Sequence, residues 1–368
     1  MAENVYESLR ELLDRHPSGC PPAGEITEIL KILFSEEEAE VALALGFRPY
    51  PVDVVAAKVG LDPQKTTKLL EALANRGVVF AKKKNATYHY ALLPILPGLF
   101  EFPFMKGERN PTLERLSNLW QTYLKKIGKE LGSPSMAFAR VITIQEPIAN
   151  EPEVLPYERL YELIDQAKVL GIAHCACRES AQNCEAPREA CMLFGDTCTY
   201  LVERGFARYI TKEEMKEKLR EFDGAGLVHQ TNNSRDRLTF ICNCCPCCCH
   251  LLRFLTELKN PHVLTSSGFI PQNDPELCSG CSICADERCP MGAISMEEAE
   301  PAIETELCIG CGLCVTGCPE GALELIRRET VPLPAATARD MGFQILKDKG
   351  KLQGFLPLIS QPSDAQKD

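Results

Sequence analysis

The sequence predicts an α+β protein of several domains, and three observations support this fold class. Helical periodicity followed by a hairpin pattern occupies the N-terminal part, whereas strand patterns alternate with cysteine-rich segments in the middle. A cysteine spacing that occurs twice lies near the C-terminus. The chain has 368 residues, which at about 100–200 residues per domain is enough for roughly two or three domains.

We expect five segments along the chain, with boundaries where composition and periodicity change. They are a helix-and-hairpin domain at 1–97, a helical linker at 98–135, a cysteine-rich α/β middle domain at 136–269, a domain built on the cysteine repeat at 270–330, and an extension with a tail at 331–368.

Two short helices and a hairpin are predicted in the first segment. Asp62 is placed to cap the second helix, because Pro63 follows at the first helical position and apolar residues recur at helical spacing until Gly77. The predicted elements are helices at 52–59 and 63–76, strands at 78–81 and 87–92, and a lysine-rich turn at 82–85.

This order of elements resembles the winged helix-turn-helix domain of many bacterial repressors. The resemblance implies that residues 64–68 would meet base edges and that the lysines of the turn would contact phosphates. DNA is nevertheless the less favoured partner, because the chain carries a formal net charge of −11 and glutamates at 36–38 precede the motif. The alternative is a protein-docking or dimerisation module on the same scaffold.

The next elements are expected to build core. Apolar spacing predicts an amphipathic helix at 113–131 and a strand at 140–145. A helix at 157–170 and a strand at 238–241 are predicted to lead into the cysteine-rich segments of the middle domain.

The C-terminal repeat is the most specific feature of the sequence. Each copy has three cysteines separated by two residues, then a Cys-Pro pair after a short gap, which is the spacing of iron–sulfur clusters. Structural zinc sites more often show two Cys-x2-Cys pairs far apart. The two copies are Cys278, Cys281, Cys284 and Cys289, and Cys308, Cys311, Cys314 and Cys318.

In a doubled repeat the fourth cysteine of each copy binds the cluster of the other copy. We therefore expect two 4Fe-4S clusters with crossed ligand sets. One departure from the pattern concerns Cys289, because four residues precede it where the pattern has three. The predicted sets are Cys278, Cys281, Cys284 and Cys318 for one cluster, and Cys308, Cys311, Cys314 and Cys289 for the other. Residues 274–325 thus resemble the bacterial two-cluster 4Fe-4S ferredoxins.

Eleven further cysteines form two segments of the middle domain, and packing alone gives cysteines no reason to gather in this way. We interpret these segments as loops that carry ligands or redox-active thiols. The cysteines are Cys175, Cys177, Cys184, Cys191 and Cys198 in the first segment, and Cys242, Cys244, Cys245, Cys247, Cys248 and Cys249 in the second.

We expect one or two further iron–sulfur clusters here. The first four cysteines of the first segment are expected to supply one cluster and the second segment most of another, with an exchange of ligands between the segments equally open. Neighbouring side chains on an extended backbone point to opposite faces, so the second segment either divides its thiolates between two centres or leaves some free. Zinc and a redox dithiol are the alternatives.

Four residues near these segments are expected to have no ligand role. Cys198 and the isolated Cys20 are interpreted as bystanders. His174 and His250 flank the cysteines and are interpreted as hydrogen-bonding neighbours.

A cytoplasmic protein without membrane insertion is expected, because residues 1–15 lack an apolar signal core and no apolar run is long enough to cross a bilayer. Twenty cysteines in a reducing compartment favour metal binding over disulfides, and so many oxygen-labile clusters suggest an anaerobic cell. Over nearly its full length the chain resembles a group of iron–sulfur proteins of strictly anaerobic bacteria and archaea, which implies a ferredoxin-like carrier or subunit and supplies no substrate.

The first function hypothesis is therefore electron transfer through 4Fe-4S clusters to or from a redox enzyme or flavoprotein. Residues 272–326 carry many acidic residues and Arg288 as their one opposing cation, so this face would attract a basic partner. The alternatives are a redox-sensing transcription regulator and a disulfide-type reductase that uses a cluster in the 242–249 segment. No nucleotide, flavin or phosphate loop is found, and no catalytic residue is assigned.

Overall fold

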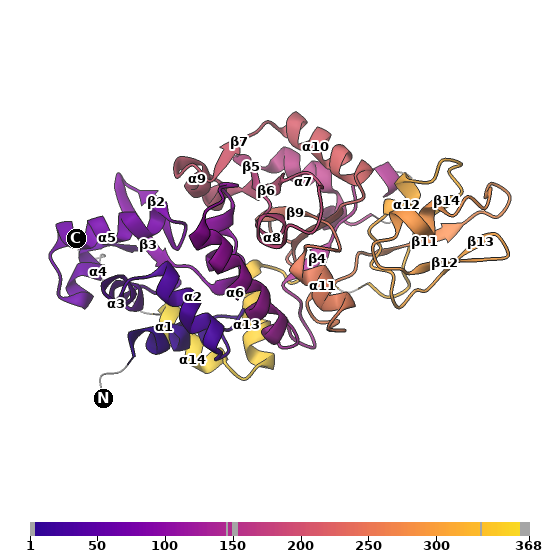
Figure 1. The fold of residues 1–368 in the computed structure, drawn as a ribbon. Helices are drawn as coiled ribbons and strands as arrows, with labels where there is room; N and C mark the ends of the chain where they lie inside the picture. The colour runs from indigo at the N-terminus through magenta and orange to yellow at the C-terminus, as the bar shows by residue number, and fades with distance from the viewer. Residues whose placement is uncertain (1–3, 145, 149–153, 332, 361–368) are drawn as a thin grey trace.

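The computed structural model describes residues 4–144, 146–148, 154–331 and 333–360. It has three regions in a row (Figure 1): N-terminal helices at one end, a seven-stranded sheet in the middle, and the small domain with the cysteine repeat at the other end. The protein is thus a mixed α/β multidomain molecule. This order in space matters for function, because the middle region contacts both ends.

Five helices and a three-stranded sheet form the N-terminal region. The prediction of Asp62 as a helix cap is confirmed, because its side chain accepts hydrogen bonds from the backbone N–H groups of Gln64 and Lys65 at 2.9 and 3.1 Å. The elements are α1 (Val5–Asp14), α2 (Gly24–Leu33), α3 (Glu36–Ala44), β1 (Tyr50–Pro51), α4 (Val52–Val59), α5 (Pro63–Asn75), β2 (Val79–Lys84) and β3 (Thr87–Leu92), with the strands in the order β1-β3-β2.

The predicted turn at 82–85 is wrong. The three lysines lie in β2, where they pair with residues 87–89 of β3. The turn consists of Asn85 and Ala86, whose φ angles of 49° and 66° both lie in the left-handed region. A two-residue turn of this kind matches the twist of the strands, so the hairpin extends to the lysines and places them along its edge rather than at its tip.

A long helix connects the N-terminal region to the middle sheet. Helix α6 (Pro111–Ile127) begins and ends earlier than predicted. It begins earlier because Asn110 caps it by accepting a hydrogen bond from the backbone N–H of Leu113 at 2.9 Å. It packs on α2, and its Ser117 donates to the carbonyl of Ser180 at 2.6 Å. Two short turns, η1 (Ile95–Leu99) and η2 (Phe102–Phe104), precede it and fill the same core.

The middle region is a mostly antiparallel sheet in the order β10-β4-β8-β9-β6-β5-β7, in which only β10 and β4 run parallel. Its strands are β4 (Ala139–Val141), β5 (Leu170–His174), β6 (Glu189–Phe194), β7 (Ala207–Tyr209), β8 (Val228–Asn232), β9 (Phe240–Cys244) and β10 (Leu264–Thr265). Its helices and turns are η3 (Glu146–Ile148), η4 (Pro156–Glu158), α7 (Leu160–Gln166), α8 (Ala176–Ala181), α9 (Gly195–Glu203), α10 (Lys212–Gly224) and α11 (His250–Thr256).

Several predictions for this region need correction. The helix expected at 157–170 is shorter, because the chain already enters β5 at Leu170. The strand expected at 140–145 ends at Val141, and Gln145 lies outside the described residues. The cysteines do not all lie on loops: Cys191 is part of β6, and Cys242 and Cys244 are part of β9.

The C-terminal domain repeats one unit twice. Each copy has a strand, a cysteine-rich loop, a short helical turn and a second strand. The strands of the two copies form two antiparallel pairs, β11 with β14 and β12 with β13. The elements are β11 (Phe269–Asn273), η5 (Cys284–Arg288), β12 (Ile294–Glu297), β13 (Glu300–Ile303), α12 (Leu313–Thr316) and β14 (Leu323–Arg327).

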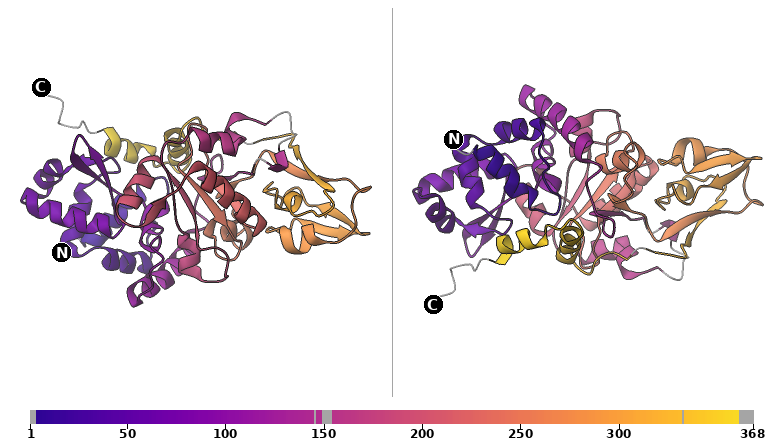
Figure 2. Two further views of the ribbon diagram at one scale, coloured as in Figure 1. Left: turned by 90° about the horizontal axis from the view of Figure 1, so that it is seen from above. Right: turned by 90° about the horizontal axis from the view of Figure 1, so that it is seen from below.

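The C-terminal extension returns to the N-terminal region. Figure 2 shows α13 (Ala338–Asp348) and α14 (Leu352–Ser360) running back past the middle sheet. Lys351 forms an ion pair with Asp14 at 2.7 Å, and the ring of Phe355 lies 6.0 Å from that of Phe47. The extension therefore joins both ends of the chain. The predicted tail from residue 361 onward lies outside the described residues.

Arg288 holds the C-terminal domain against the middle region. Its guanidinium donates to the backbone carbonyls of Leu313, Gly224 and Asp223 at 2.8, 3.0 and 3.0 Å. It also lies 3.5 Å from the carboxylate of Asp223, and only 11% and 6% of the two side chains are exposed. A guanidinium is a planar cation with five N–H donors, so it can bond several carbonyls at once. Since these carbonyls belong to both the C-terminal domain and the middle region, Arg288 joins the two.

We predict that Arg288→Ala loosens the C-terminal domain. Removing one partner of a buried ion pair leaves the other charge unpaired, at a cost of about 3–5 kcal/mol. Limited proteolysis should cut the segments that flank the domain, near residues 266–268 and 329–331, several times faster than in the unmodified protein. Glu287→Ala changes an exposed neighbour and is the control. Equal cleavage rates for the two variants would contradict the assignment.

Candidate metal centres

Two cavities in the C-terminal domain are each lined by four cysteines. Each takes three cysteines from one copy of the repeat and the fourth from the other. The first cavity is lined by Cys278, Cys281, Cys284 and Cys318, and the second by Cys289, Cys308, Cys311 and Cys314. Each predicted set of four cysteines, with its fourth member from the other copy, therefore surrounds one cavity.

The extra residue before Cys289 is absorbed by a wider helical turn. The first copy has the π-type turn η5 where the second copy has the shorter helix α12. A π-type turn accommodates one more residue per turn. Both fourth cysteines end up in equivalent positions, because the sulfurs of Cys289 and Cys318 accept backbone N–H groups from Ala293 and Ala322 at 3.2 and 3.3 Å.

The two cavities differ in their surroundings. The first is lined by Met296 and Pro301 of the β12–β13 hairpin, which Figure 1 shows at the end of the molecule away from the middle region, and Cys281 in its lining is exposed. The second is lined by Arg288 and faces the middle region. Burial raises the pKa of Cys311 to about 12, so at neutral pH this thiol keeps its proton unless a metal ion binds the sulfur and displaces it.

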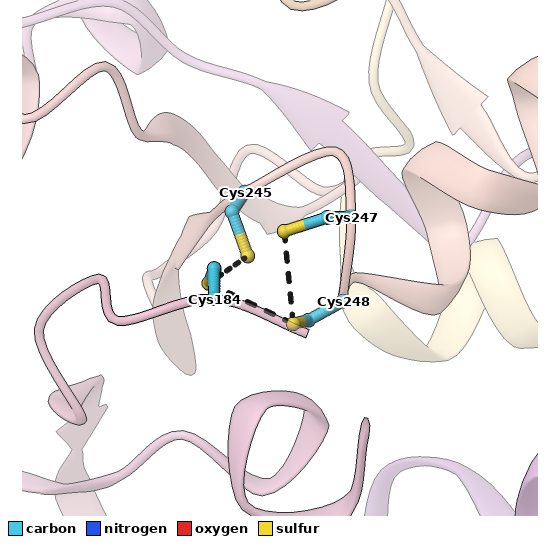
Figure 3. Close-up of side chains that lie close together, drawn as sticks. All are labelled: Cys184, Cys245, Cys247 and Cys248. Atoms are coloured by element: carbon cyan, nitrogen blue, oxygen red, sulfur yellow. Dashed lines mark hydrogen bonds between the residues drawn. The ribbon is translucent and has the colours of Figure 1, made fainter. Parts of the chain in front are cut away.

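A third group of thiols lies in the middle region, where Figure 3 shows four sulfurs pointing toward one another. The sulfurs of Cys184, Cys245, Cys247 and Cys248 all lie within 4.8 Å of one another. The distances from Cys184 to Cys245 and to Cys248 are 3.6 and 3.8 Å, and Cys247 lies 3.7 Å from Cys248. Cys184 comes from the loop after α8, and the others come from the turn between β9 and α11.

Six more cysteines form a second, separate group. Each of these thiols shifts the pKa of the next one in the group, and three of them are buried while the other three are half-buried. In order of these pairwise effects the group consists of Cys175, Cys177, Cys249, Cys244, Cys242 and Cys191. Both groups thus combine cysteines of the two segments: Cys184 lies with the second segment rather than with the other cysteines of the first.

Strand register explains this grouping. Cys191 and Cys242 are direct partners on the adjacent strands β6 and β9, so their side chains share one face of the sheet. Cys244 is two residues further along β9 and faces the same way. Cys175 and Cys249 precede α8 and α11, which brings both helix N-termini to this face.

Arg178 supplies a positive charge between the two thiol groups. Its side chain is fully buried and donates to the carbonyl of Pro187 at 2.7 Å. Burial opposes its charge, but the neighbouring thiolates of Cys175 and Cys245 raise its pKa above the ordinary value. The pKa of Cys245 is lowered to about 4, first by a hydrogen bond from Cys248 and then by the charge of Arg178.

A buried polar chain leads from the second cavity to strand β9. Arg288 contacts Asp223, and the second oxygen of that carboxylate lies 3.9 Å from Nε2 of His229. The Nδ1 of His229 lies 2.6 Å from the side-chain oxygen of Asn243, which stands between Cys242 and Cys244 in β9. These three middle-region residues are almost fully buried.

Sequence reasoning missed Arg178, Asp223, His229 and Asn243. A usable signal existed for two of them, because Arg178 directly follows Cys177 and Asn243 interrupts a run of cysteines. The remaining candidates lie outside the thiol groups: Cys20 accepts a hydrogen bond from Tyr123, Cys198 is buried in α9, His174 lies 3.0 Å from Glu179, and His250 stacks on Phe100.

Residues 277–328 match the family model of the 4Fe-4S dicluster domain. The C-terminal domain therefore binds 4Fe-4S clusters, and the cysteines of the middle region could bind further ones. Together these sites indicate an iron–sulfur redox function. Searches among curated proteins and among solved structures returned no match to the chain. No helix in the described part of the chain combines the length and the apolar composition needed to cross a bilayer.

We predict that His229 makes stability depend on pH. Burial lowers its folded-state pKa to about 4, whereas the unfolded value is about 6.5. As the pH falls, the unfolded chain binds this proton first, so stability is lost between pH 6.5 and 4, by up to about 3 kcal/mol. Anaerobic urea unfolding across this range should show a flatter pH dependence for His229→Gln. The same substitution at the exposed His262 should leave the slope unchanged.

Proposed function

We propose that the protein transfers low-potential electrons between an external redox partner and a cluster in its middle region. The observation that carries this proposal is the order of the thiol groups, from an exposed cavity through a cavity at the domain boundary to a buried six-thiol group. Clusters held at short range in such an order pass electrons stepwise, with potentials set by their exposure and hydrogen bonds.

In the C-terminal domain we assign the outer cluster to Cys278, Cys281, Cys284 and Cys318. The inner cluster is assigned to Cys308, Cys311, Cys314 and Cys289. The crossed cavities and the match to the dicluster family support this assignment. The outer cluster would exchange electrons with a partner, because it lies near the protein surface. The inner cluster would pass them on, because it lies against the middle region.

We assign a further iron–sulfur cluster to the six-thiol group of Cys175, Cys177, Cys191, Cys242, Cys244 and Cys249. Its thiols come from two strands and two helix N-termini, so the sulfurs approach one centre from several sides. A cubane needs four thiolates, which this group supplies with two to spare. The chain from Arg288 through Asp223 and His229 to Asn243 leads from the inner cluster to β9, and Cys242 and Cys244 lie on the opposite face of that strand.

The outer face of the C-terminal domain suits a basic partner. All eleven acidic residues between 272 and 326 are exposed, whereas Arg288 is turned inward and bonded to the middle region. Leu277, which precedes Cys278, is 53% exposed and offers an apolar contact among these charges. We therefore propose a redox enzyme or flavoprotein with a positively charged docking site as the partner.

DNA binding remains the less favoured role of the N-terminal region. Lys65 and Lys82, two of the cations that would meet DNA, form ion pairs with Glu37 and Asp196. The hairpin also packs on α9: the ring of Phe80 lies 5.1 Å from that of Tyr200, which donates to the carbonyl of Val79 at 2.9 Å. We propose that this winged-helix-like region docks the middle region rather than nucleic acid.

We predict about twelve irons per chain in anaerobically purified protein, about eight from the dicluster domain and four from the six-thiol group. The triple variant Cys191→Ser/Cys242→Ser/Cys244→Ser leaves three thiols in the group, one fewer than a cubane needs, so it should lose about four irons and one reduced-state EPR signal and keep the signals of the other two clusters. Cys198→Ser, which removes a buried thiol outside all groups, should change neither quantity. A content of about eight irons that the triple variant leaves unchanged would overturn the middle cluster.

We predict that the double variant Glu276→Lys/Glu297→Lys slows electron transfer to a basic acceptor such as cytochrome c. Both residues are exposed near the outer cluster, so the loss of attraction should lower the bimolecular rate by about tenfold at low ionic strength. The difference should disappear at high salt.

The matched control is Glu203→Lys/Glu213→Lys, which makes the same change in net charge on α9 and α10. If the control slows the reaction equally, net charge rather than the outer face governs docking.

A further inference from the structure

The four-thiol group of Cys184, Cys245, Cys247 and Cys248 has the dimensions of a site for one metal ion. In a tetrahedral site with metal–sulfur bonds of about 2.3 Å, the sulfurs are separated by roughly 3.8 Å. The three hydrogen-bonded sulfur pairs of this group are 3.6, 3.7 and 3.8 Å apart. We propose that these four cysteines bind a single zinc ion in a closed tetrahedral site.

The cluster cavities of the same molecule provide a contrast. A cubane carries its four thiolates on separate corners, so the sulfurs surround a body several ångströms wide instead of a point. Within the described part of the chain, one group of three or more sulfurs has all its members within 4.8 Å of one another, and it is the four-thiol group. The cysteines of the C-terminal domain instead stand around two cavities and form no such close group.

The backbone around the site explains how adjacent cysteines share one ion. Cys245, Cys247 and Cys248 lie in a turn rather than a strand, so the side chains of the neighbours Cys247 and Cys248 both point inward (Figure 3). Pro246 lies in the same turn. The fourth ligand, Cys184, comes from a distant loop, and the set is therefore complete without water, as in structural zinc sites.

Neighbouring groups hold the ligands in place. The side-chain amide of Asn183 donates to the carbonyl of Cys247 at 2.9 Å, and Arg188 donates to the carbonyl of Cys184 at 3.1 Å. Four thiolates and one divalent ion leave two negative charges, and the positive charge of the buried Arg178, which interacts with Cys245, offsets one of them. Such outer contacts orient the ligands of a metal site.

Zinc fits this role better than iron for two physical reasons. It has no accessible redox change, so it would tie the loop after α8 to the turn before α11 without accepting electrons from the neighbouring six-thiol group. Thiolate sites also bind zinc more tightly than ferrous iron. The ion would thereby hold Cys244 and Cys249, which flank the turn, in a constant position.

The test uses the full-length protein purified without air. Elemental analysis should find about one zinc per chain besides the iron, and zinc X-ray absorption should show four sulfurs at about 2.3 Å. Cys247→Ser should lose most of the zinc and keep the iron of the dicluster domain. Cys281→Ser, at the outer cluster, should keep the zinc.

Cys247→His serves as a second variant, because histidine also binds zinc. It should keep most of the zinc if residue 247 is a ligand, whereas a loss caused only by misfolding would persist in this variant. Absence of zinc in the intact protein would overturn the proposal. It would also be overturned by a mixed sulfur and oxygen shell, or by loss of iron in place of zinc in Cys247→Ser. A three-cluster iron content with no zinc would leave the electron-transfer proposal standing, so the two proposals fail separately.

Discussion

The burial of many thiols at one junction is the constraint on which the rest of the structure depends. Ten sulfurs in two groups lie where β6, β9, α8 and α11 meet, and the structure places few positive charges beside them. A buried thiolate without a cation is costly, and a buried thiol is a poor donor. The metal centres that we propose for these groups would remove this cost, so the fold of the middle region and the loading of those centres would depend on each other.

The other two regions are arranged around this junction. The C-terminal domain is held by buried contacts of Arg288 that reach backbone carbonyls, so its inner cavity always faces the same part of the middle region. The acidic residues are left on the outside, where they do not add to the negative charge of the buried thiolates. On the other side, the N-terminal hairpin packs on α9, and the C-terminal helices join that region to the middle.

Local signals allowed many elements to be predicted. Asp62 and Pro63 predicted the start of α5, and Gly60 predicted the end of α4, since caps and helix ends depend on a few adjacent residues. The hairpin turn failed because Asn85 and Ala86 carry no glycine, so their left-handed conformations gave no sequence signal. The positions of Asp223, His229 and Asn243 in one buried chain depend on contacts between distant strands, which periodicity does not encode.

The sequence by itself determined that the C-terminal domain binds two clusters, because a tight cysteine spacing forces nearby thiols onto one small object. It also predicted that most of the middle cysteines are ligands or reactive thiols. Only the tertiary structure decided how those cysteines divide. The register of β6 against β9 sets Cys191 opposite Cys242, and a turn directs Cys247 and Cys248 toward Cys184. Such groupings arise from contacts between residues far apart in the chain, and spacing along the chain does not encode them.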